Sequence, residues 1–332
     1  MTEIRLGTIG SGVIARSVLD GVKETDGISL AAVYSRTEER AKSLADEYGA
    51  DVIYTDMDRF FADTDVNCVY IATPNLLHYE QTKKALEAGK HVLCEKPFCT
   101  RADQAEELFN LAESKGLFLY EAVPTSFLPN YKILKRELSK IGRVRLVMSN
   151  YSQYSSRYDK LIAGELPNIF NPKYAGGCLM DINIYNIYLN IALFGAPDAA
   201  VYHPNRYQTA EGMIDVSGVV TMQYPDFISF CAGAKDTWGE NFFQIEGENG
   251  YIYIKGGGNG LREIRTVTKT SDRTLNEQSN PSRWYYEIQD FTRLLLSENR
   301  DAFRERRRVT LDTIRCIETV RKAAGIYFPG DL

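Results

Sequence analysis

Histidine is scarce in this sequence, which has three among its 332 residues, and its six cysteines form no C-x-x-C pair. Because protein zinc sites are built mainly from cysteine and histidine at short, recurring spacings, a zinc site is hard to assemble from this composition. We therefore predict no metal site and interpret the cysteines as free, mostly buried thiols.

An excess of positive charge is also missing. Lysine and arginine number 39 against 44 aspartates and glutamates, which gives a net charge of −5. Nucleic-acid binding needs basic surfaces that neutralise phosphates, so we expect no such partner. Nowhere do about 18 apolar residues run together, and the first residues lack the basic start and apolar core of a signal peptide. These absences predict no membrane association and a cytoplasmic location.

The first part of the chain alternates between two patterns. A length of 332 residues favours two domains. Up to about residue 120, segments of helical periodicity separate short apolar runs, which read IRLGTIG, ISLAAVYS, DVIYT, NCVYIAT, KHVLCE and LFLYEA. Strand and helix in alternation predict an α/β fold, a doubly wound parallel sheet with helices on both faces. We assign this domain to residues 1–122.

Residues 123–332 have a different rhythm. Between about 200 and 270 several strand-like runs follow one another, joined by turn dipeptides, and read VSGVVTMQY, FISFCAGAK, NFFQIEGENG, YIYIKG and EIRTVTKT. Strands in succession predict an open antiparallel or mixed sheet. Helical patterns occupy residues 181–194 and, at the end of the chain, 283–297 and 310–324. We interpret this region as an α+β domain for substrate binding and oligomerisation, whose final helices can pack back on the first domain.

A glycine-rich turn follows the first predicted strand. The sequence Gly10-Ser11-Gly12-Val13-Ile14-Ala15 fits the G-x-G-x-x-G/A fingerprint, in the strand-to-helix context that the fingerprint requires. Gly10 permits a tight turn, and Gly12 lets a pyrophosphate approach the backbone. We predict a dinucleotide site that includes residues Gly10 to Ile14; the alternative is a plain tight turn.

The end of the second predicted strand bears on which dinucleotide binds. An acidic residue there would bind the ribose 2′-hydroxyl of NAD, but this chain has Ser35, Arg36 and Thr37. A guanidinium group pairs well with a 2′-phosphate, so we favour NADP over NAD. The alternative is that Arg36 is a solvated residue at a helix start, where Glu38 and Glu39 weaken the electrostatic case.

Two further strand ends carry polar residues. Thr73, Pro74 and Asn75 follow the fourth predicted strand, with His78 one turn into the next helix. We predict that these four residues contact the cofactor; the alternative is a helix cap with a surface histidine. The fifth strand ends in Glu95, Lys96 and Pro97. Carboxyl ends of parallel strands are where open α/β sheets bind ligands, so Glu95 and Lys96 are predicted at the nicotinamide end of the site.

In the second domain an acid and a phenol are spaced by one helical turn. The run Gly176-Gly177-Cys178-Leu179-Met180-Asp181 precedes Tyr185, and on a helix Asp181 and Tyr185 share one face. An aromatic residue at such a spacing is usually core. Combined with Lys96, however, the pair favours chemistry, because an ammonium group near a phenol lowers the pKa of the phenol.

Together these segments resemble the glucose-fructose oxidoreductase and inositol dehydrogenase family (Gfo/Idh/MocA). The resemblance rests on the Gly10 fingerprint, the segment from Thr73 to His78, Glu95-Lys96-Pro97, the glycine-rich run ending at Asp181, and IEGENGYIYI at 245–254. Tyr185 stands where sugar and inositol dehydrogenases of the family usually have histidine. With tyrosine at this position, the chain is similar to the branch of the family that contains dimeric dihydrodiol dehydrogenase and NADP-dependent xylose dehydrogenase.

The resemblance implies a Rossmann domain, a C-terminal open sheet that forms a dimer or tetramer, and a sugar, polyol or dihydrodiol-like substrate. We hypothesise hydride transfer between nicotinamide and a secondary alcohol or hemiacetal carbon. In this hypothesis Tyr185 exchanges the hydroxyl proton, Lys96 holds the oxygen, and Asp181 orients Lys96. Two alternatives remain open, a regulator that senses NADP without turnover and an enzyme that retains NAD.

Overall fold

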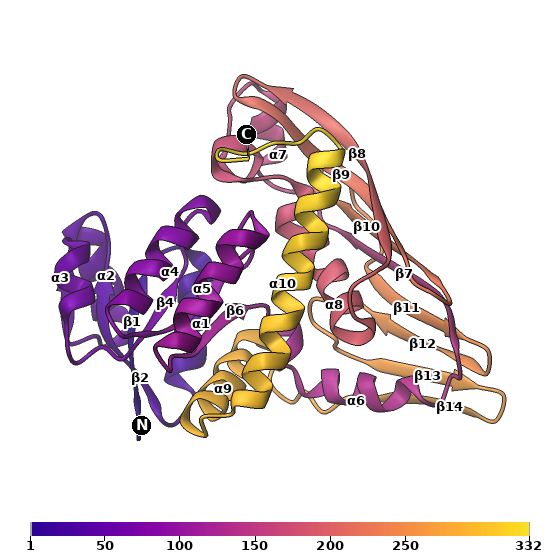
Figure 1. Ribbon diagram of the computed structural model, residues 1–332, viewed down its shortest axis with the longest axis horizontal. Coiled ribbons are helices and arrows are strands. Elements are labelled where there is room, and N and C mark those ends of the chain that lie inside the picture. Colours follow the sequence, from indigo (N-terminus) through magenta and orange to yellow (C-terminus); the bar gives the residue numbers. More distant parts are fainter. Residues whose placement is uncertain (1, 332) are drawn as a thin grey trace. The chain divides into compact units, whose positions relative to one another are not determined.

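A parallel sheet of six strands forms the N-terminal part of the chain (Figure 1). The structure is a computed structural model, and it describes residues 2–331. The strands are β1 (Ile4–Ile9), β2 (Ile28–Tyr34), β3 (Val52–Tyr54), β4 (Cys68–Ile71), β5 (His91–Glu95) and β6 (Leu119–Ala122). Their order, β3-β2-β1-β4-β5-β6, is that of a Rossmann doubly wound sheet. The six predicted runs and their parallel pairing are thus confirmed, and the strand order reverses between β1 and β4.

The helices of this sheet are amphipathic, as their sequence periodicity predicts. They are α1 (Val13–Lys23), α2 (Glu38–Tyr48), α3 (Met57–Ala62), α4 (His78–Glu87) and α5 (Ala102–Ser114), with single turns η1 (Asn75–Leu77) and η2 (Pro124–Phe127). In α1 the buried residues Ala15, Val18, Leu19 and Val22 recur every three or four positions and form one apolar face.

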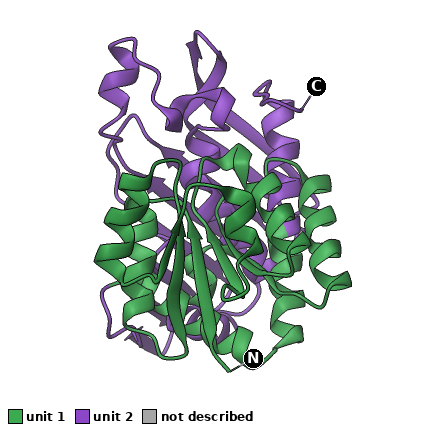
Figure 2. Ribbon diagram, turned by 90° about the vertical axis from the view of Figure 1, so that its left-hand side faces the viewer, with its two compact units in different colours: residues 1–127, 282–310 green, residues 128–281, 311–332 purple. Residues whose placement is uncertain are grey.

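The residues divide into two units (Figure 2). Unit 1 contains the described residues up to Phe127 and also Ser282–Thr310, while unit 2 contains Leu128–Pro281 and the described residues from Leu311. Helix α9 (Arg283–Leu296) packs on α1 so closely that a Cβ on Gly21 would lie 2.9 Å from the carbonyl oxygen of Trp284. The late helix α9 is therefore part of the Rossmann unit.

The last helix, α10 (Arg300–Ala323), is longer than the predicted 310–324, which is wrong at its start. Residues 300–309 are rich in arginine and show little apolar periodicity. The structure explains why they are helical. Phe303 is buried, the side chain of Asn299 accepts a hydrogen bond from the backbone N–H of Ala302 (2.9 Å), and Arg300 donates to the carbonyl of Leu117 (3.1 Å). Tertiary contacts thus extend the helix beyond its sequence signal.

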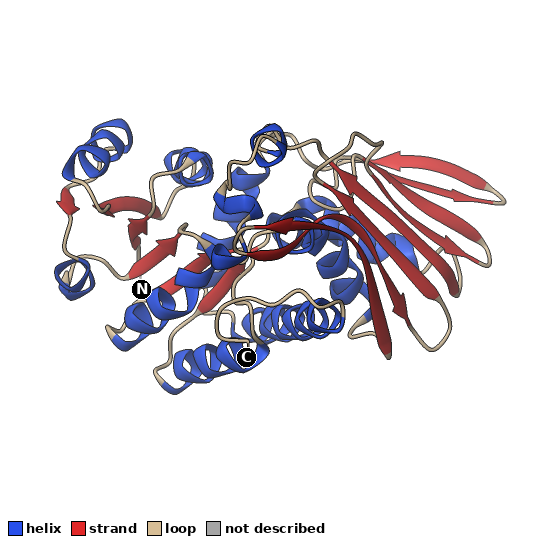
Figure 3. Ribbon diagram, turned by 90° about the horizontal axis from the view of Figure 1, so that it is seen from above, coloured by secondary structure: helices blue, strands red, loops and turns tan. Residues whose placement is uncertain are grey.

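Unit 2 is built on an eight-stranded sheet (Figure 3). The prediction of an antiparallel or mixed sheet is confirmed, because the sheet is mixed. In spatial order its strands are β14 (Ser271–Leu275), β13 (Ile264–Thr268), β12 (Gly250–Lys255), β11 (Phe242–Gly247), β7 (Val144–Ser152), β10 (Ile228–Ala234), β9 (Gly212–Gln223) and β8 (Ala199–Thr209). Only β7 and β10 pair in parallel among these strands. Their carboxyl ends therefore lie at one edge of the sheet.

The sequence reading missed β8 and β14, which are the two outer strands. Both have mostly exposed or half-exposed side chains, and β8 contains Pro204. Outer strands have only one hydrogen-bonding neighbour and are commonly protected by charged residues or proline, so the apolar alternation that marks inner strands is weak in them.

The helices of unit 2 include one irregular turn. They are α6 (Pro129–Leu138), α7 (Tyr158–Ile162), α8 (Ile184–Phe194) and the single turns η3 (Asn168–Phe170), η4 (Pro172–Tyr174) and η5 (Leu179–Asn183). The predicted helix at 181–194 is wrong at its start, because η5 is a π-helical turn and α8 begins at Ile184. No helix within residues 2–331 is long and apolar enough to cross a membrane.

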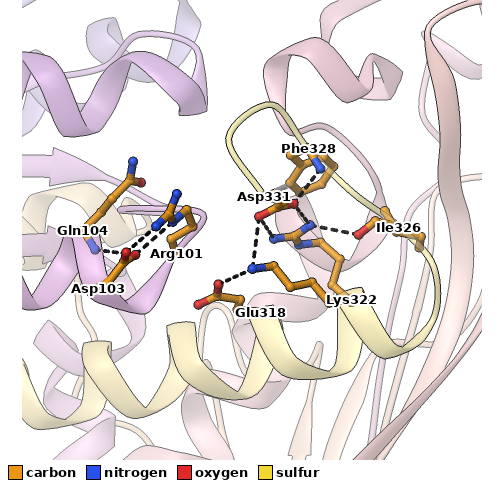
Figure 4. Close-up of polar contacts among 9 residues, drawn as sticks. Arg101, Asp103, Gln104, Glu318, Lys322, Ile326, Phe328 and Asp331 are labelled. Carbon is orange, nitrogen blue, oxygen red and sulfur yellow. Dashed lines mark hydrogen bonds and ion pairs between the residues drawn. The ribbon is translucent and has the colours of Figure 1, made fainter.

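The end of the chain is held by a buried ion pair in unit 2. Arg321 and Asp331 are both almost fully buried and form a salt bridge, and Asp331 also accepts a hydrogen bond from the backbone N–H of Phe328 at 2.6 Å (Figure 4). The Arg321 guanidinium lies 4.2 Å from the centre of the Phe328 ring. These contacts hold the residues that follow α10.

Candidate active site

The glycine-rich turn after β1 has the geometry that its sequence predicts. Gly10 has φ +116°, and a Cβ at this position would lie 2.3 Å from the carbonyl oxygen of Ala72 at the end of β4. Only glycine permits this close approach of the two strand ends. Gly12 precedes α1, and a Cβ there would meet no atom within 4 Å. Space therefore lies beside the start of α1.

The first residues of α1 are unusually exposed for apolar side chains. Val13 is 78% exposed and Ile14 is 40% exposed, next to Ser11 and Gly12. The first backbone N–H groups of a helix have no partner within the helix and favour negative charge. An apolar surface beside such N–H groups fits a dinucleotide, which presents a pyrophosphate together with flat rings.

The segment after β2 places a cation at the same edge of the sheet. Ser35 is buried, and its backbone N–H donates to the carbonyl of Tyr54 at 3.1 Å. Arg36 and Thr37 are exposed, and Thr37 precedes the first residue of α2. Arg40, in the first turn of α2, is a second exposed arginine that the sequence reading did not single out. These residues suit a phosphate on the adenosine ribose.

The His78 side chain contacts the segments that follow two strands and does not face solvent. Its side chain is fully buried, Nδ1 lies 2.9 Å from the carbonyl oxygen of Pro97, and Nε2 lies 2.9 Å from that of Thr73. The alternative of a surface histidine is therefore wrong. Burial lowers the pKa of His78, although the two carbonyl groups oppose this effect. The imidazole joins the Thr73 segment, which includes Pro74 and the half-buried Asn75, to the turn after Lys96.

Lys96 follows β5 directly and is half-buried. The residue before it, Glu95, accepts a hydrogen bond from the Tyr70 hydroxyl at 2.6 Å. Burial raises the pKa of Glu95, and the hydrogen bond from Tyr70 and the charge of Lys96 oppose this rise. The acid beside Lys96 is thus fixed by a partner on the neighbouring strand β4.

Glu121 in β6 is a site residue that the sequence reading missed. One carboxylate oxygen accepts the backbone N–H of Phe98 at 3.0 Å, and the other accepts the hydroxyl of Thr310 at 2.9 Å. Burial raises the pKa of Glu121 to about 7, against the lowering effect of these two hydrogen bonds. Because Phe98 lies two residues after Lys96, Glu121 fixes the backbone of the turn that carries Lys96.

In unit 2, Asp181 is ion-paired with Lys235, which the sequence reading also missed. Lys235 follows β10 and its side chain is 7% exposed, against 23% for Asp181. Its carbonyl accepts the backbone N–H of Ser155 at 2.9 Å, which joins the segments after β7 and β10. A lysine at the end of an apolar strand was the available signal, the same signal that singled out Lys96.

The glycine-rich run before Asp181 has a structural cause. Gly177 has φ +114°, and a Cβ there would lie 2.2 Å from an oxygen of Asp215. The buried carboxylate of Asp215 accepts the backbone N–H of Leu179 at 2.6 Å and the hydroxyl of Tyr202 at 2.7 Å. Asp215 therefore anchors the start of the π-helical turn that carries Asp181.

Tyr185 lies at the start of α8 and is 5% exposed in the isolated chain. Its ring packs edge-on against Tyr151 of β7, with centroids 5.9 Å apart. Two asparagines fix this helix to the sheet, since Asn183 donates to the carbonyl of Cys231 and Asn186 to that of Ala232, both at 2.9 Å. Tyr185 thus occupies a rigid position in unit 2, and its role in proton exchange stays a prediction.

Comparison with known proteins finds a matching family model for each half of the chain. Residues 4–122 match the model of the oxidoreductase family with an NAD-binding Rossmann fold, and residues 137–253 match the Gfo/Idh/MocA C-terminal domain. The chain is 36% identical to scyllo-inositol 2-dehydrogenase (NADP(+)) IolU of Bacillus subtilis, over 99% of each protein. It is 31% identical to trans-1,2-dihydrobenzene-1,2-diol dehydrogenase of Sus scrofa over 67% of this chain and 65% of that one.

Among solved structures, a 3-ketoreductase from Actinomadura kijaniata in complex with NADP and TDP-benzene has the same fold. It superimposes with a TM-score of 0.85 at 23% identity, covering 96% of this chain and 97% of that one. The matching family models and the full-length relative agree with the resemblance found in the motifs. The chain belongs to the Gfo/Idh/MocA family and is an NAD(P)-dependent oxidoreductase.

Proposed function

We propose that the protein is an NADP-dependent dehydrogenase that oxidises a secondary alcohol of a cyclic polyol or sugar. The observation that carries this proposal is the Asp181–Lys235 pair, held beside the Tyr185 helix. A carboxylate and an ammonium group together can accept from and donate to neighbouring hydroxyl groups, which is what a polyol ring presents. The full-length similarity to a scyllo-inositol dehydrogenase supports the same substrate class.

Arg36 and Arg40 support NADP as the preferred cofactor. Both are exposed after β2, and no acidic residue occupies the segment Ser35–Thr37. A carboxylate there would hold the 2′-hydroxyl of NAD and repel a 2′-phosphate, whereas a guanidinium pairs with the phosphate in a bidentate manner. The relative from Bacillus subtilis is likewise named for NADP(+).

The proposed chemistry assigns one task to each side chain. A nicotinamide cofactor, held by the Gly10 turn and Arg36, would supply the hydride acceptor. Tyr185 takes the proton from the substrate hydroxyl as that hydroxyl becomes a carbonyl, and Lys96 holds the same oxygen. Asp181, expected from the sequence to orient Lys96, is paired with Lys235 in its own unit, so we assign the pair to binding the neighbouring hydroxyl groups.

We further propose a cytoplasmic homodimer or tetramer. The sheet of unit 2 exposes Val201, Ile228 and Phe230, at 52%, 41% and 42%, on its strands β8 and β10. Apolar side chains gathered on one sheet surface suit an interface with a second copy. All six cysteines are buried free thiols, which suits a reducing compartment.

The proposed function is tested with the purified protein, NADP⁺ or NAD⁺, and a panel of scyllo-inositol, myo-inositol, D-xylose and a trans-dihydrodiol. We expect reduction of NADP⁺, followed at the nicotinamide absorbance band, with at least one cyclic polyol or sugar, and slower reduction of NAD⁺. Binding of NADPH without turnover of any compound in either direction would contradict the proposal and favour a regulator that senses NADP.

A further inference from the structure

Trp238 is the most exposed large aromatic residue of the described chain, at 77%. Its ring is stacked on that of Tyr154, with centroids 5.9 Å apart and planes inclined by 12°. The sequence contains only two tryptophans. Leaving so large an apolar surface in water is unfavourable, so its exposure calls for a function.

The position of Trp238 is fixed by the loop that carries it. This loop follows β10 and begins with Lys235, the partner of Asp181. Its far end is tied to β7, because Asn150 donates from Nδ2 to the carbonyl of Glu240 at 2.8 Å, and Asn241 accepts the backbone N–H of Ser152 at 2.7 Å. The tryptophan therefore lies on a loop anchored at both ends.

A row of aromatic rings leads from Trp238 back to the ion pair. Tyr154 packs edge-on against Tyr158 (5.8 Å), Tyr158 contacts Phe170 (6.0 Å), and the ammonium of Lys235 lies 5.6 Å from the centre of the Phe170 ring. The Tyr154 hydroxyl donates to Asp159 at 2.6 Å, which fixes its ring. The exposed stack is thus linked to the charged pair, within unit 2, by a row of neighbouring rings that includes the buried Phe170.

We propose that the Trp238–Tyr154 stack is a subsite that binds the apolar face of the substrate ring. This inference rests on the proposed function, because it assumes a cyclic polyol or sugar as substrate. A ring whose hydroxyl groups are equatorial directs them outward and presents axial C–H groups on its two faces. A flat aromatic surface complements the C–H face, while Asp181 and Lys235 complement the hydroxyl groups.

The subsite predicts selectivity for rings over open chains. An acyclic alcohol has no C–H face that matches the indole ring, so it gains little from stacking. The indole contact forms equally in substrate and transition state, so its loss raises KM and leaves kcat almost unchanged. This division between KM and kcat separates a binding subsite from a role in folding.

The test compares Trp238→Ala and Trp238→Phe with wild type, using scyllo-inositol and acyclic butane-2,3-diol. For Trp238→Ala we expect KM for scyllo-inositol to rise by about three- to tenfold, the contribution of one aromatic contact, with kcat within about twofold. Trp238→Phe retains a ring and should stay within about twofold of wild type. Tyr327→Ala, which removes another exposed ring (45%) after α10, is the matched control. An unchanged KM in Trp238→Ala would overturn the subsite.

A binding measurement separates failure of the subsite from failure of the proposed function. In the Trp284→Phe variant, Trp238 is the only tryptophan. Its fluorescence emission is followed while scyllo-inositol is added in the presence of NADPH. A saturable change supports the subsite even when no turnover occurs, which would overturn only the dehydrogenase assignment. No change at any concentration overturns the subsite. A loss of oligomer mass in Trp238→Ala with KM unchanged would also overturn it, by showing that Trp238 contacts a second copy.

Discussion

Asp181 and Lys235 form an ion pair that joins the π-helical turn before α8 to the end of strand β10. The lysine is nearly buried and the aspartate is partly so. Each charge has its compensating partner within unit 2, so neither depends on a bound substrate to be tolerated in the fold. A pair that is already formed presents a fixed arrangement of donor and acceptor to a polyol, which reduces the ordering needed on binding.

Replacing one partner of this pair should be more damaging than replacing both. In Lys235→Met, the partly buried Asp181 carboxylate loses its ion pair with Lys235, so we expect kcat/KM to fall at least about tenfold and stability to fall by about 3 kcal/mol. The double variant Lys235→Met/Asp181→Leu should recover much of the stability and none of the activity. Urea unfolding and steady-state kinetics measure the two effects. Equal stability of Lys235→Met and wild type would show that the pair is not formed.

Glu121 should make stability depend on pH. Burial raises the pKa of Glu121 in the folded protein to about 7, above its ordinary value of 4.5. Between these values the folded state holds a proton that the unfolded state releases, so the free energy of unfolding falls as pH rises through this window. Glu121→Gln removes that titration while keeping an acceptor for the Phe98 N–H. We expect unfolding midpoints measured at about pH 5 and pH 8 to differ less in the variant; an identical pH dependence of the two proteins would refute this.

Arg36 should govern the choice between the two dinucleotides. Loss of its guanidinium removes a charge-assisted pair with the 2′-phosphate, which is worth about 2 kcal/mol. We expect Arg36→Ala to weaken NADPH affinity at least about tenfold and to leave NADH affinity within about twofold, as measured by cofactor fluorescence. Arg5→Ala, which removes an arginine paired with Asp51 instead, is the control. An unchanged NADPH-to-NADH affinity ratio in Arg36→Ala would remove Arg36 from the site.

Asp331 should stabilise the end of the chain in a pH-dependent manner. Burial raises the pKa of its carboxyl, but hydrogen bonds from Arg321 and the Phe328 N–H outweigh burial and hold the pKa below its ordinary value of 3.8. The stabilisation is therefore present above pH 3.8 and is lost as pH falls through the lower folded value. Asp331→Asn removes the carboxylate that is paired with the buried Arg321, and we expect it to cost about 3 kcal/mol at neutral pH. Hydrogen exchange at Ile326 and Phe328 should increase; unchanged protection there would contradict the assigned role.

Local patterns predicted most of the Rossmann unit, because each buried strand and amphipathic helix carries its own signal. The Gly10 turn could be predicted for the same reason, since the six residues from Gly10 to Ala15 contain the whole fingerprint. The role of Glu121 could not be predicted from a local pattern, because its hydrogen-bond partner Thr310 lies 189 positions away in the chain. The reason for a glycine at position 177 is its contact with Asp215, which is distant in the sequence, so it could not be predicted either. Lys235 differs, since its signal at a strand end was present in the sequence and was passed over.

We propose that Tyr185 exchanges the proton of the substrate hydroxyl during hydride transfer, while Lys96 holds the substrate oxygen. The most direct test is the turnover number of Tyr185→Phe and Lys96→Met, measured with the best substrate of the panel and saturating NADP⁺. We expect kcat to fall at least about 100-fold in each variant, because a positioned acid or base, or a group that stabilises developing charge, typically contributes this much, while NADPH affinity of Tyr185→Phe stays at the wild-type value. If either variant retained more than about a tenth of wild-type turnover, the residue concerned would have no such role.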